Sequence, residues 1–291
     1  MSGSGNRLRG IACILVSSFG FALMAFFVRL CDDYGVGLSS FQKSFFRNAI
    51  ALLIAGFVFV RQHEPSGTVV STIGRLSGRQ WFYLILRSLA GTVGIFANFY
   101  ALSRIPLGEA MTLNKTAPFF TVLFAWLVMG ERVSRRQAIC LVVAFLGAVL
   151  VMKPTDLHGP SVWALIGGIG AGFAYACVHK LGRLGTEGSV IVFFFSAFSC
   201  LAALPFVFFD YTPMTVAQLL ILLGAGCGAA IGQFGVTAAY RWAEPRSIAV
   251  FDYSNVIFTS FLGFVFFAQV PDLWAVCGFV AILLAAFSMR R

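Results

Sequence analysis

Long apolar runs separated by short polar turns dominate this sequence. A membrane-spanning helix needs roughly 20 predominantly apolar residues, and ten runs of about that length divide the chain. We expect helices over residues 8–30, 40–60, 80–102, 107–129, 135–152, 160–181, 188–208, 215–240, 245–268 and 272–289. The pattern therefore predicts an all-α integral membrane protein of ten transmembrane helices, with no room for a soluble domain.

The composition supports a location in lipid. Apolar residues make up 59% of the chain and charged residues only 11%, whereas soluble domains carry about 25% charged residues. No small-residue cleavage site follows the first apolar run, so we expect it to be a retained span and not a signal peptide. The seven cysteines are scattered through apolar runs without metal-ligand spacing, which is typical of small buried residues. We predict neither a metal site nor a cofactor.

The basic residues indicate how the chain is oriented. A net charge of +10 could indicate a nucleic-acid partner, but the Lys and Arg residues stand mainly at the ends of the apolar runs, where the positive-inside rule places them. With the N-terminus in the cytoplasm, fourteen of them fall on the cytoplasmic side and four on the opposite side. Both termini are therefore predicted to be cytoplasmic, with the lipid bilayer and no nucleic acid as partner. Arg47, Arg87 and Lys115 remain, and all three fall inside predicted spans.

The two halves of the chain resemble each other. An offset of 138 residues aligns three polar pairs: Asn114 with Asp252, Lys115 with Tyr253, and Glu131 with Gln269. Residues 1–152 and 153–291 would each hold five helices, and because five is odd the second half enters the membrane from the opposite side. This is the inverted repeat that many secondary transporters use for alternating access.

Residues 99–152 carry a resemblance to a known family. The segments "FYALSRIPLGEAMTL", "APFFTVLFAWLVMGERVSRRQ" and "GAVLVM" resemble the EamA group of the drug/metabolite transporter superfamily, and the ten-helix layout extends the likeness over essentially the whole chain. The resemblance implies a small-molecule transporter with an inverted-repeat bundle and a central cavity. The chain departs from the family pattern at Gln269-Val270, where a Gly-Glu pair usually repeats. Members move very different substrates, so the resemblance does not identify the molecule transported.

Lys115 is the first candidate for substrate binding. An ionisable group inside a span costs several kcal/mol unless it faces a wet cavity or has a partner. Pro118 cannot donate to the carbonyl of Asn114, and polar side chains beside loosened backbone are typical of transporter sites. The alternatives are pairing with Asp252 or a lysine that reaches the membrane surface.

The second and third spans add two arginines to the predicted site. Arg87 and Asn98 belong to a stripe at helical spacing that also contains Gly91 and Gly94. Arg47 lies in the second span, and the guanidinium fork is suited to carboxylate or phosphate groups. The alternative for both arginines is a structural role near the membrane edge.

The ninth span supplies the acidic and neutral polar candidates. Asp252, Tyr253 and Asn255 offer a carboxylate and two hydrogen-bonding groups. Asp252 could pair with Lys115, bind an ammonium group or carry a coupling proton. Three cations against this one acid favour a substrate with a negative group, such as a carboxylate, a phosphate or the acid end of a zwitterion.

Other polar features have simpler interpretations. Tyr100 and Tyr175 complete the predicted site, although tyrosines near span ends usually anchor a protein at the interface. We expect His179, beside Lys180 at a cytoplasmic helix end, to be solvated. Glu131 lies in the turn after the fourth span, where a structural salt bridge or gate latch is expected. Two glycine pairs at small-xxx-small spacing predict close helix packing: Gly168 with Gly172, and Gly224 with Gly228.

These observations predict a secondary transporter in a bacterial inner membrane. It would move an anionic or zwitterionic metabolite, for example an amino acid or an S-adenosylmethionine-like molecule, by alternating access, coupled to a proton or to exchange of a second metabolite. The sequence has no ATP-binding, HExxH or GxSxG motif, so an enzyme is not expected. A channel-like facilitator is the alternative.

Overall fold

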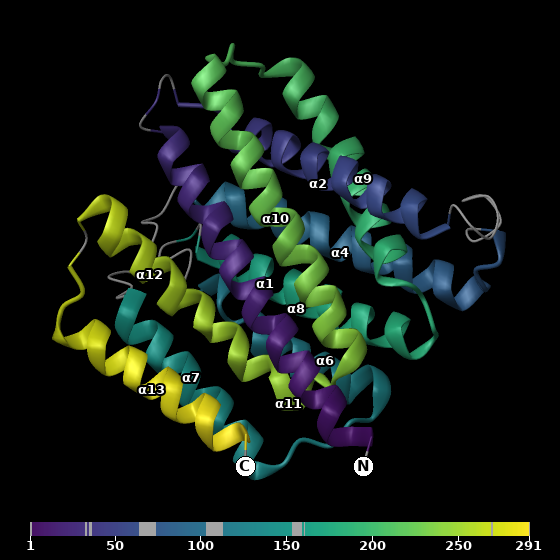
Figure 1. Ribbon diagram of the computed structural model, residues 1–291, viewed down its shortest axis with the longest axis vertical. Helices are drawn as coiled ribbons and strands as arrows, with labels where there is room; N and C mark the ends of the chain where they lie inside the picture. Colours follow the sequence, from purple (N-terminus) through teal and green to yellow (C-terminus); the bar gives the residue numbers. More distant parts are fainter. Residues whose placement is uncertain are drawn as a thin grey trace.

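The computed structural model describes residues 2–32, 34, 37–63, 74–102, 113–152, 159, 161–268 and 270–290. Throughout these ranges the regular structure is helical (Figure 1). The elements are α1 (Ser2–Asp32), α2 (Ser40–His63), α4 (Gly78–Leu102), α6 (Ala117–Met129), α7 (Arg135–Met152), α8 (Ser161–Arg183), α9 (Gly188–Phe209), α10 (Val216–Trp242), α11 (Pro245–Ile248), the 3-10 helix η1 (Ala249–Tyr253), α12 (Ser254–Phe267) and α13 (Leu273–Arg290).

The ten expected spans are confirmed as helical segments, with two differences. The fourth helix, α6, begins only at Ala117. It follows the 113–116 turn, in which Leu113 and Asn114 are still helical and Lys115 and Thr116 leave the helix; residues 107–112 lie outside the described residues. The ninth span is not one continuous helix but α11, η1 and α12 in succession. The 3-10 segment reads AVFDY, and its last four residues are weak helix formers. Arg104, Lys153 and Gln269 also lie outside the described residues.

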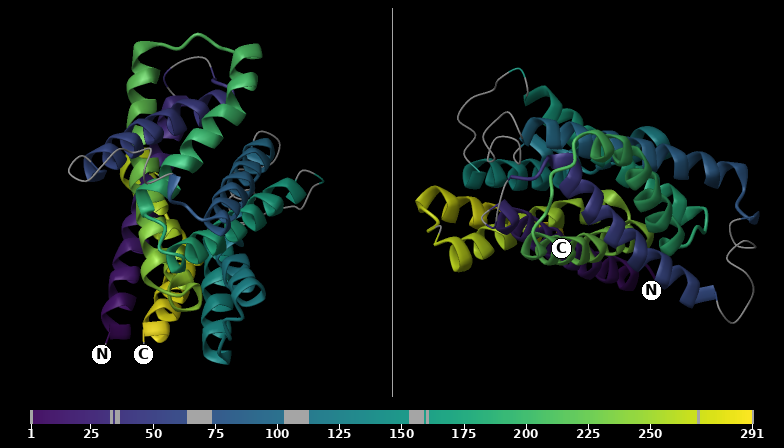
Figure 2. Two further views of the ribbon diagram at one scale, coloured as in Figure 1. Left: turned by 90° about the vertical axis from the view of Figure 1, so that its right-hand side faces the viewer. Right: turned by 90° about the horizontal axis from the view of Figure 1, so that it is seen from above.

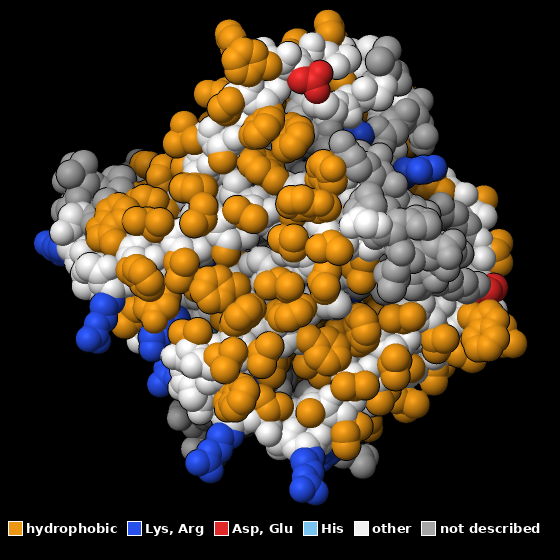
Figure 3. Space-filling model, turned by 180° about the vertical axis from the view of Figure 1, so that it is seen from behind, with side chains coloured by type: hydrophobic (Ala, Val, Ile, Leu, Met, Phe, Trp, Pro, Cys, Tyr) orange, Lys and Arg blue, Asp and Glu red, His pale blue; other side chains and the backbone are white. Residues whose placement is uncertain are grey.

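The outer surface is apolar, as expected in lipid. Six helical stretches are long and apolar enough to cross a membrane, and α6 and most of α13 are shorter apolar helices. Large hydrophobic side chains stand on the outside, including Leu53 at 73% and Phe208 at 81% exposure. Figure 3 shows hydrophobic side chains spread over much of one face. An apolar surface this extensive would aggregate in water, so the protein is a multi-pass membrane protein.

The main helix–helix contacts join a helix from the first half of the chain to a helix from the second half. Helix α1 lies along α10, and α4 lies along α8, so the first helix of each half pairs with the third helix of the other. In the same way α6 packs on α8 while α12 packs on α1. Helices α2 and α9 contact each other, as do α7 and α13 (Figure 1). This reciprocal pairing agrees with the inverted repeat predicted from the sequence.

Both chain termini lie at the same end of the bundle, which we call the terminal end (Figures 1 and 2). An even number of spans requires this arrangement. The space-filling view shows several Lys and Arg side chains projecting from the terminal end on that face (Figure 3).

Small residues allow the paired helices to approach closely. A methyl group added at Gly228 of α10 would lie 2.8 Å from the backbone nitrogen of Met24 and 2.9 Å from the carbonyl oxygen of Gly20, both in α1. On α8, a methyl at Gly168 would clash with Thr116 Oγ1 and lie 2.9 Å from the Leu113 carbonyl oxygen. The glycine pairs therefore serve close packing, as predicted from their spacing.

The two halves share local backbone features at equivalent positions. Helix α6 is followed by the C-cap residue Gly130 with φ 69°, and α12 by the C-cap residue Ala268 with φ 53°. These residues are 138 positions apart, the offset found in the sequence. Each helix is also preceded by irregular backbone, the 113–116 turn before α6 and η1 before α12. The fold thus interrupts the corresponding span in both halves.

Candidate substrate-binding site

Arg87 is the most deeply buried cation among the described residues. It lies on α4 with 1% of its surface exposed. Its Nη2 donates to Gln233 Oε1 of α10 at 2.9 Å, and its guanidinium carbon lies 3.6 Å from the centre of the Phe195 ring of α9. Nε and Nη1 have no hydrogen-bond partner within the described part of the chain. Two donors of a buried cation are therefore available to an anion.

Arg47 on α2 is in a similar position. Only 6% of its surface is exposed. Nη1 contacts Met24 Sδ of α1 at 3.1 Å, and Nε and Nη2 reach Asn48 Oδ1 at 3.4 and 3.3 Å. Sulfur and long amide contacts are weak partners for a guanidinium. The described residues place no carboxylate within 4 Å of either arginine, so both are buried charges without an ion pair, which is costly unless a ligand compensates them.

The 113–116 turn carries Asn114 and Lys115 into the bundle. Thr116 Oγ1 donates to the Leu113 carbonyl at 2.6 Å, and Gly168 of α8 leaves room for the turn. Lys115 is surrounded by protein and lies within electrostatic range of Asp252, yet it keeps accessible surface. It forms no hydrogen bond or ion pair with any described residue. Direct pairing of Lys115 with Asp252 is therefore not observed, although the two side chains are within electrostatic range.

Asp252 and its neighbours in sequence fix this part of the chain to α1. Ser18 Oγ of α1 lies 3.4 Å from Asp252 Oδ1, and Asn255 Nδ2 donates to the Ser18 carbonyl at 2.8 Å. Tyr253 is fully buried, and its hydroxyl has no partner among the residues that are described. Asn255 thus has a structural contact, whereas the Asp252 carboxylate keeps most of its hydrogen-bonding capacity.

Tyr175 connects the charged groups. Its ring on α8 stacks on Tyr240 of α10, with the centroids 5.5 Å apart and the planes at 26°. It lies within electrostatic range of Arg47, Arg87 and Asp252. The arrangement brings together cations from α2 and α4, and an acid from η1, around one aromatic pair. We call these residues the charged cluster: Arg47, Arg87, Asp252, Tyr175 and Tyr240.

The remaining predicted residues divide into two groups. Asn98 and Asn114 both pack against Gly167 of α8, and Asn98 Oδ1 is buried without a partner in the described structure. Tyr100 is 38% exposed and contacts the Trp163 ring at 5.2 Å. Tyr100 therefore lies at the outside of the α4–α8 pair and apart from the charged cluster.

The expectation for His179 is wrong. Instead of being solvated, His179 is 4% exposed. Its Nε2 lies 2.9 Å from Glu131 Oε1 and its Nδ1 lies 2.5 Å from the Tyr240 carbonyl oxygen. Close packing of α8, α10 and the 130–134 turn buries it, and this cannot be read from its position near a helix end. The salt bridge expected for Glu131 is present.

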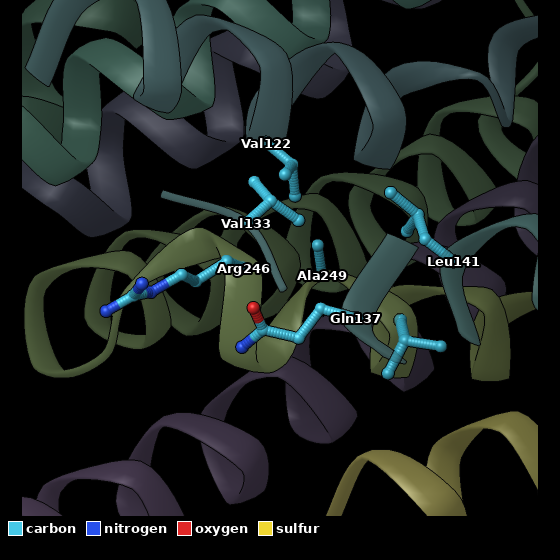
Figure 4. Close-up of a pocket in the computed structure, with 7 residues that line it drawn as sticks. Val122, Val133, Gln137, Leu141, Arg246 and Ala249 are labelled. Carbon is cyan, nitrogen blue, oxygen red and sulfur yellow. The ribbon is translucent and has the colours of Figure 1, made fainter. Parts of the chain in front are cut away.

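Two clefts lie apart from the charged cluster. The first, which has no room for a water molecule, lies between α6, α7 and η1 and is lined mainly by apolar side chains, with Gln137 beside them (Figure 4). The Arg246 side chain extends away from Val122 and Leu141 in that view. The second, about 360 Å³, lies where α9 begins and includes Glu187 and Arg241. Neither is lined by a predicted substrate-binding residue, and the two arginines are closed off from solvent.

Comparison with known proteins identifies the family. The model described as "EamA-like transporter family" matches residues 8–153. The chain belongs to the EamA-like transporter family. It is also similar to the pseudopaline exporter CntI of Pseudomonas aeruginosa, at 30% identity over 285 residues that cover 97% of this chain and 96% of that protein. EamA transporters are part of the drug/metabolite transporter superfamily, so this chain is a membrane transporter and not an enzyme.

More distant relatives in this superfamily include transporters with other names. The riboflavin transporter of Vibrio cholerae is 24% identical over 287 residues, covering 94% of this chain and 91% of that protein. Human solute carrier family 35 member G1 is 26% identical over 310 residues, covering 94% and 76%. One crystal structure at 20% identity superposes with a TM-score of 0.78 over 99% of this EamA chain and 96% of its own, which shows the same fold.

Sequence reasoning missed several residues that complete the cluster. Phe195 stacks on Arg87, and Ser18 contacts Asp252. Gln233 binds Arg87, and a polar amide inside an apolar span is a recognisable signal. Phe195 gave no signal, because it is one of many phenylalanines in a strongly apolar helix.

Proposed function

We propose that this EamA protein is a secondary transporter for a small organic metabolite that carries a carboxylate or phosphate, alone or as part of a zwitterion. The main support for this proposal is that the buried cations have no acidic partner in the described part of the chain. Arg47 and Arg87 have no ion pair among the described residues, and Lys115, which protein surrounds, forms no hydrogen bond or ion pair with any of them. An anionic group on the substrate would compensate these unpaired positive charges.

Each side chain has a proposed role in holding the substrate. Arg87 would donate through its free Nε and Nη1, with Gln233 and Phe195 holding its plane. Arg47 and Lys115 would add positive charge from α2 and from the 113–116 turn. Asp252 would receive an ammonium group if the substrate is a zwitterion, and Tyr175 would pack against its apolar part.

The transport cycle we infer is alternating access by the two halves, residues 1–152 and 153–291. Interrupted helices at equivalent positions, before α6 and before α12, support this division. So does the reciprocal packing of α1 on α10 and α4 on α8. Discontinuous helices at a repeat interface are a common basis for transporter sites.

The orientation we infer has both termini in the cytoplasm of a bacterial inner membrane. The Lys and Arg side chains at the terminal end support it (Figure 3), because cytoplasmic ends are enriched in these residues. The terminal end would then be the cytoplasmic entrance.

Counterflow in proteoliposomes tests the function. Vesicles are loaded with one unlabelled compound and mixed with a trace of the same labelled compound, across a panel of amino acids, dicarboxylates, sugar phosphates, S-adenosylmethionine and riboflavin. A carrier gives a saturable overshoot for at least one anionic or zwitterionic compound. Ohmic conductance without overshoot would identify a channel-like facilitator, and an overshoot only for cationic compounds would contradict the proposed charge of the substrate.

A further inference from the structure

Outside the charged cluster, a buried ionisable pair joins three elements at the terminal end. His179 of α8 lies between Glu131 of the 130–134 turn and the Tyr240 carbonyl of α10. His179 and Glu131 are 4% and 9% exposed. The turn belongs to the first half of the chain and the two helices belong to the second. The pair therefore ties one half to the other.

The contacts of the imidazole fix how many protons the pair holds. A carbonyl oxygen only accepts hydrogen bonds, so Nδ1 must carry a hydrogen to face Tyr240 at 2.5 Å. Nε2 faces a carboxylate oxygen at 2.9 Å, and two lone pairs at that distance would repel each other. One further proton must therefore lie between them, whether it is bonded to Nε2 or to the carboxylate.

The surroundings of Glu131 make its contact with His179 depend on this proton. Glu131 Oε2 is buried and has no hydrogen-bond partner within the described residues, and Arg183 Nη1 is 3.9 Å from Oε1 on a side chain that is 59% exposed. Loss of the proton would leave a buried carboxylate with weak compensation, facing the Nε2 lone pair. Such a state is costly, and separation of the turn from α8 relieves it.

Few other ionisable groups surround the pair. On α8, Lys180 follows His179, and on α10, Arg241 follows Tyr240 and packs against Gly182. From α11, Arg246 donates to the Arg132 carbonyl of the turn and is paired with Glu244. The nearby charges are thus mainly basic and peripheral, and none occupies the His179–Glu131 contact.

Two aromatic rings connect the His179–Glu131 pair to the charged cluster. Tyr240, whose carbonyl meets His179, stacks on Tyr175. Tyr175 lies one helical turn before His179 and within electrostatic range of Arg47 and Arg87. Contiguous packed side chains therefore lie between the pair and the proposed substrate groups, as physical coupling between two sites requires.

We propose that His179 and Glu131 form a proton-binding site that locks the terminal end of the transporter. With the proton bound, the 130–134 turn is held on α8 and α10. Release of this proton to the solvent at the terminal end breaks the contact, with no change in electron count, and opens the entrance. This deepens the proposed carrier function, because it makes the proton a coupling ion.

Reactivity of Cys177 tests the proposal without a transported substrate. Cys177 is 3% exposed on α8, two residues before His179, and lies within electrostatic range of Arg87. All other cysteines are replaced by alanine, and the labelling rate with N-ethylmaleimide is measured over roughly pH 5 to 9, a range that extends to both sides of the ordinary pKa of a histidine side chain. Glu131→Gln in this background keeps a polar contact that cannot titrate, and Glu244→Gln is the matched control at an exposed carboxylate.

Thiol chemistry alone accelerates labelling with pH in every variant, so the slopes are compared. Between the lowest and the highest pH, the labelling rate should increase by a factor at least about fivefold larger in the parent than in Glu131→Gln, in line with typical coupling between sites. Glu244→Gln should follow the parent. If Glu131→Gln does not fold, His179→Gln should flatten the slope equally. Identical slopes in the parent and either folded variant would overturn the proton site, even if counterflow establishes a carrier; failed counterflow with a differential slope would instead count against the proposed substrates.

Discussion

Arg87→Lys tests the geometry of the substrate site most selectively, because it keeps the charge and removes the fork. The wild-type guanidinium has one donor on Gln233 and two unpartnered nitrogens, Nε and Nη1. An anion that used both would gain two charge-assisted hydrogen bonds, of which a lysine could keep one. The loss is then about 1.5 to 3 kcal/mol, which corresponds to roughly a 10- to 150-fold higher half-saturation concentration.

The assay is counterflow with whichever compound the wild type exchanges, measured at several concentrations. Arg79→Lys is the matched control, since Arg79 is exposed eight residues earlier on the same helix. Thermal unfolding in detergent verifies that the variants are folded. A half-saturation concentration within about twofold of the wild type for folded Arg87→Lys would refute the assignment of Nε and Nη1 to the substrate.

Three further predictions concern packing and backbone. Gly168→Ala should displace the 113–116 turn and abolish counterflow, with a loss of about 1 to 3 kcal/mol in stability, whereas Gly56→Ala, whose added methyl meets nothing closer than 3.6 Å, should transport normally. Gly130→Ala should lower and Ala268→Gly should raise the free energy of unfolding by roughly 1 kcal/mol each, seen as opposite shifts in Tm, because both residues are left-handed. Gln233→Leu should lower Tm by removing about 1.5 to 3 kcal/mol of hydrogen bonding to Arg87. Unchanged transport in Gly168→Ala or parallel Tm shifts at Gly130 and Ala268 would contradict these arguments.

Most of the fold could be predicted from the sequence, because helix length in a membrane is set by the thickness of the bilayer. The runs leading to α2, α9 and α10 agree with the helices within a few residues. Pro118 indicated irregular backbone before α6. The break at η1 contains no proline or glycine, and its position depends on contacts with α1 that no local pattern reveals.

The candidate site could be predicted only in part. Charge inside a span identified Arg47, Arg87 and Lys115, since such residues are rare in lipid. Their partners could not be found in this way, because Gln233 is 146 residues from Arg87 along the chain. The burial of His179 likewise depends on Glu131, 48 residues away. Tyr100 matched the pattern of the site but lies outside the cluster, because a tyrosine near a helix end can face either lipid or the interior.

Counterflow by Lys115→Ala beside the wild type tests the central claim, that internal cations bind the anionic group of the substrate. Lys43→Ala, near the start of α2, is the matched control. We predict saturable exchange in the wild type and in Lys43→Ala, and at least a tenfold loss of apparent affinity, about 1.4 kcal/mol, in Lys115→Ala. Exchange of the same compound with unchanged affinity in folded Lys115→Ala would contradict the claim.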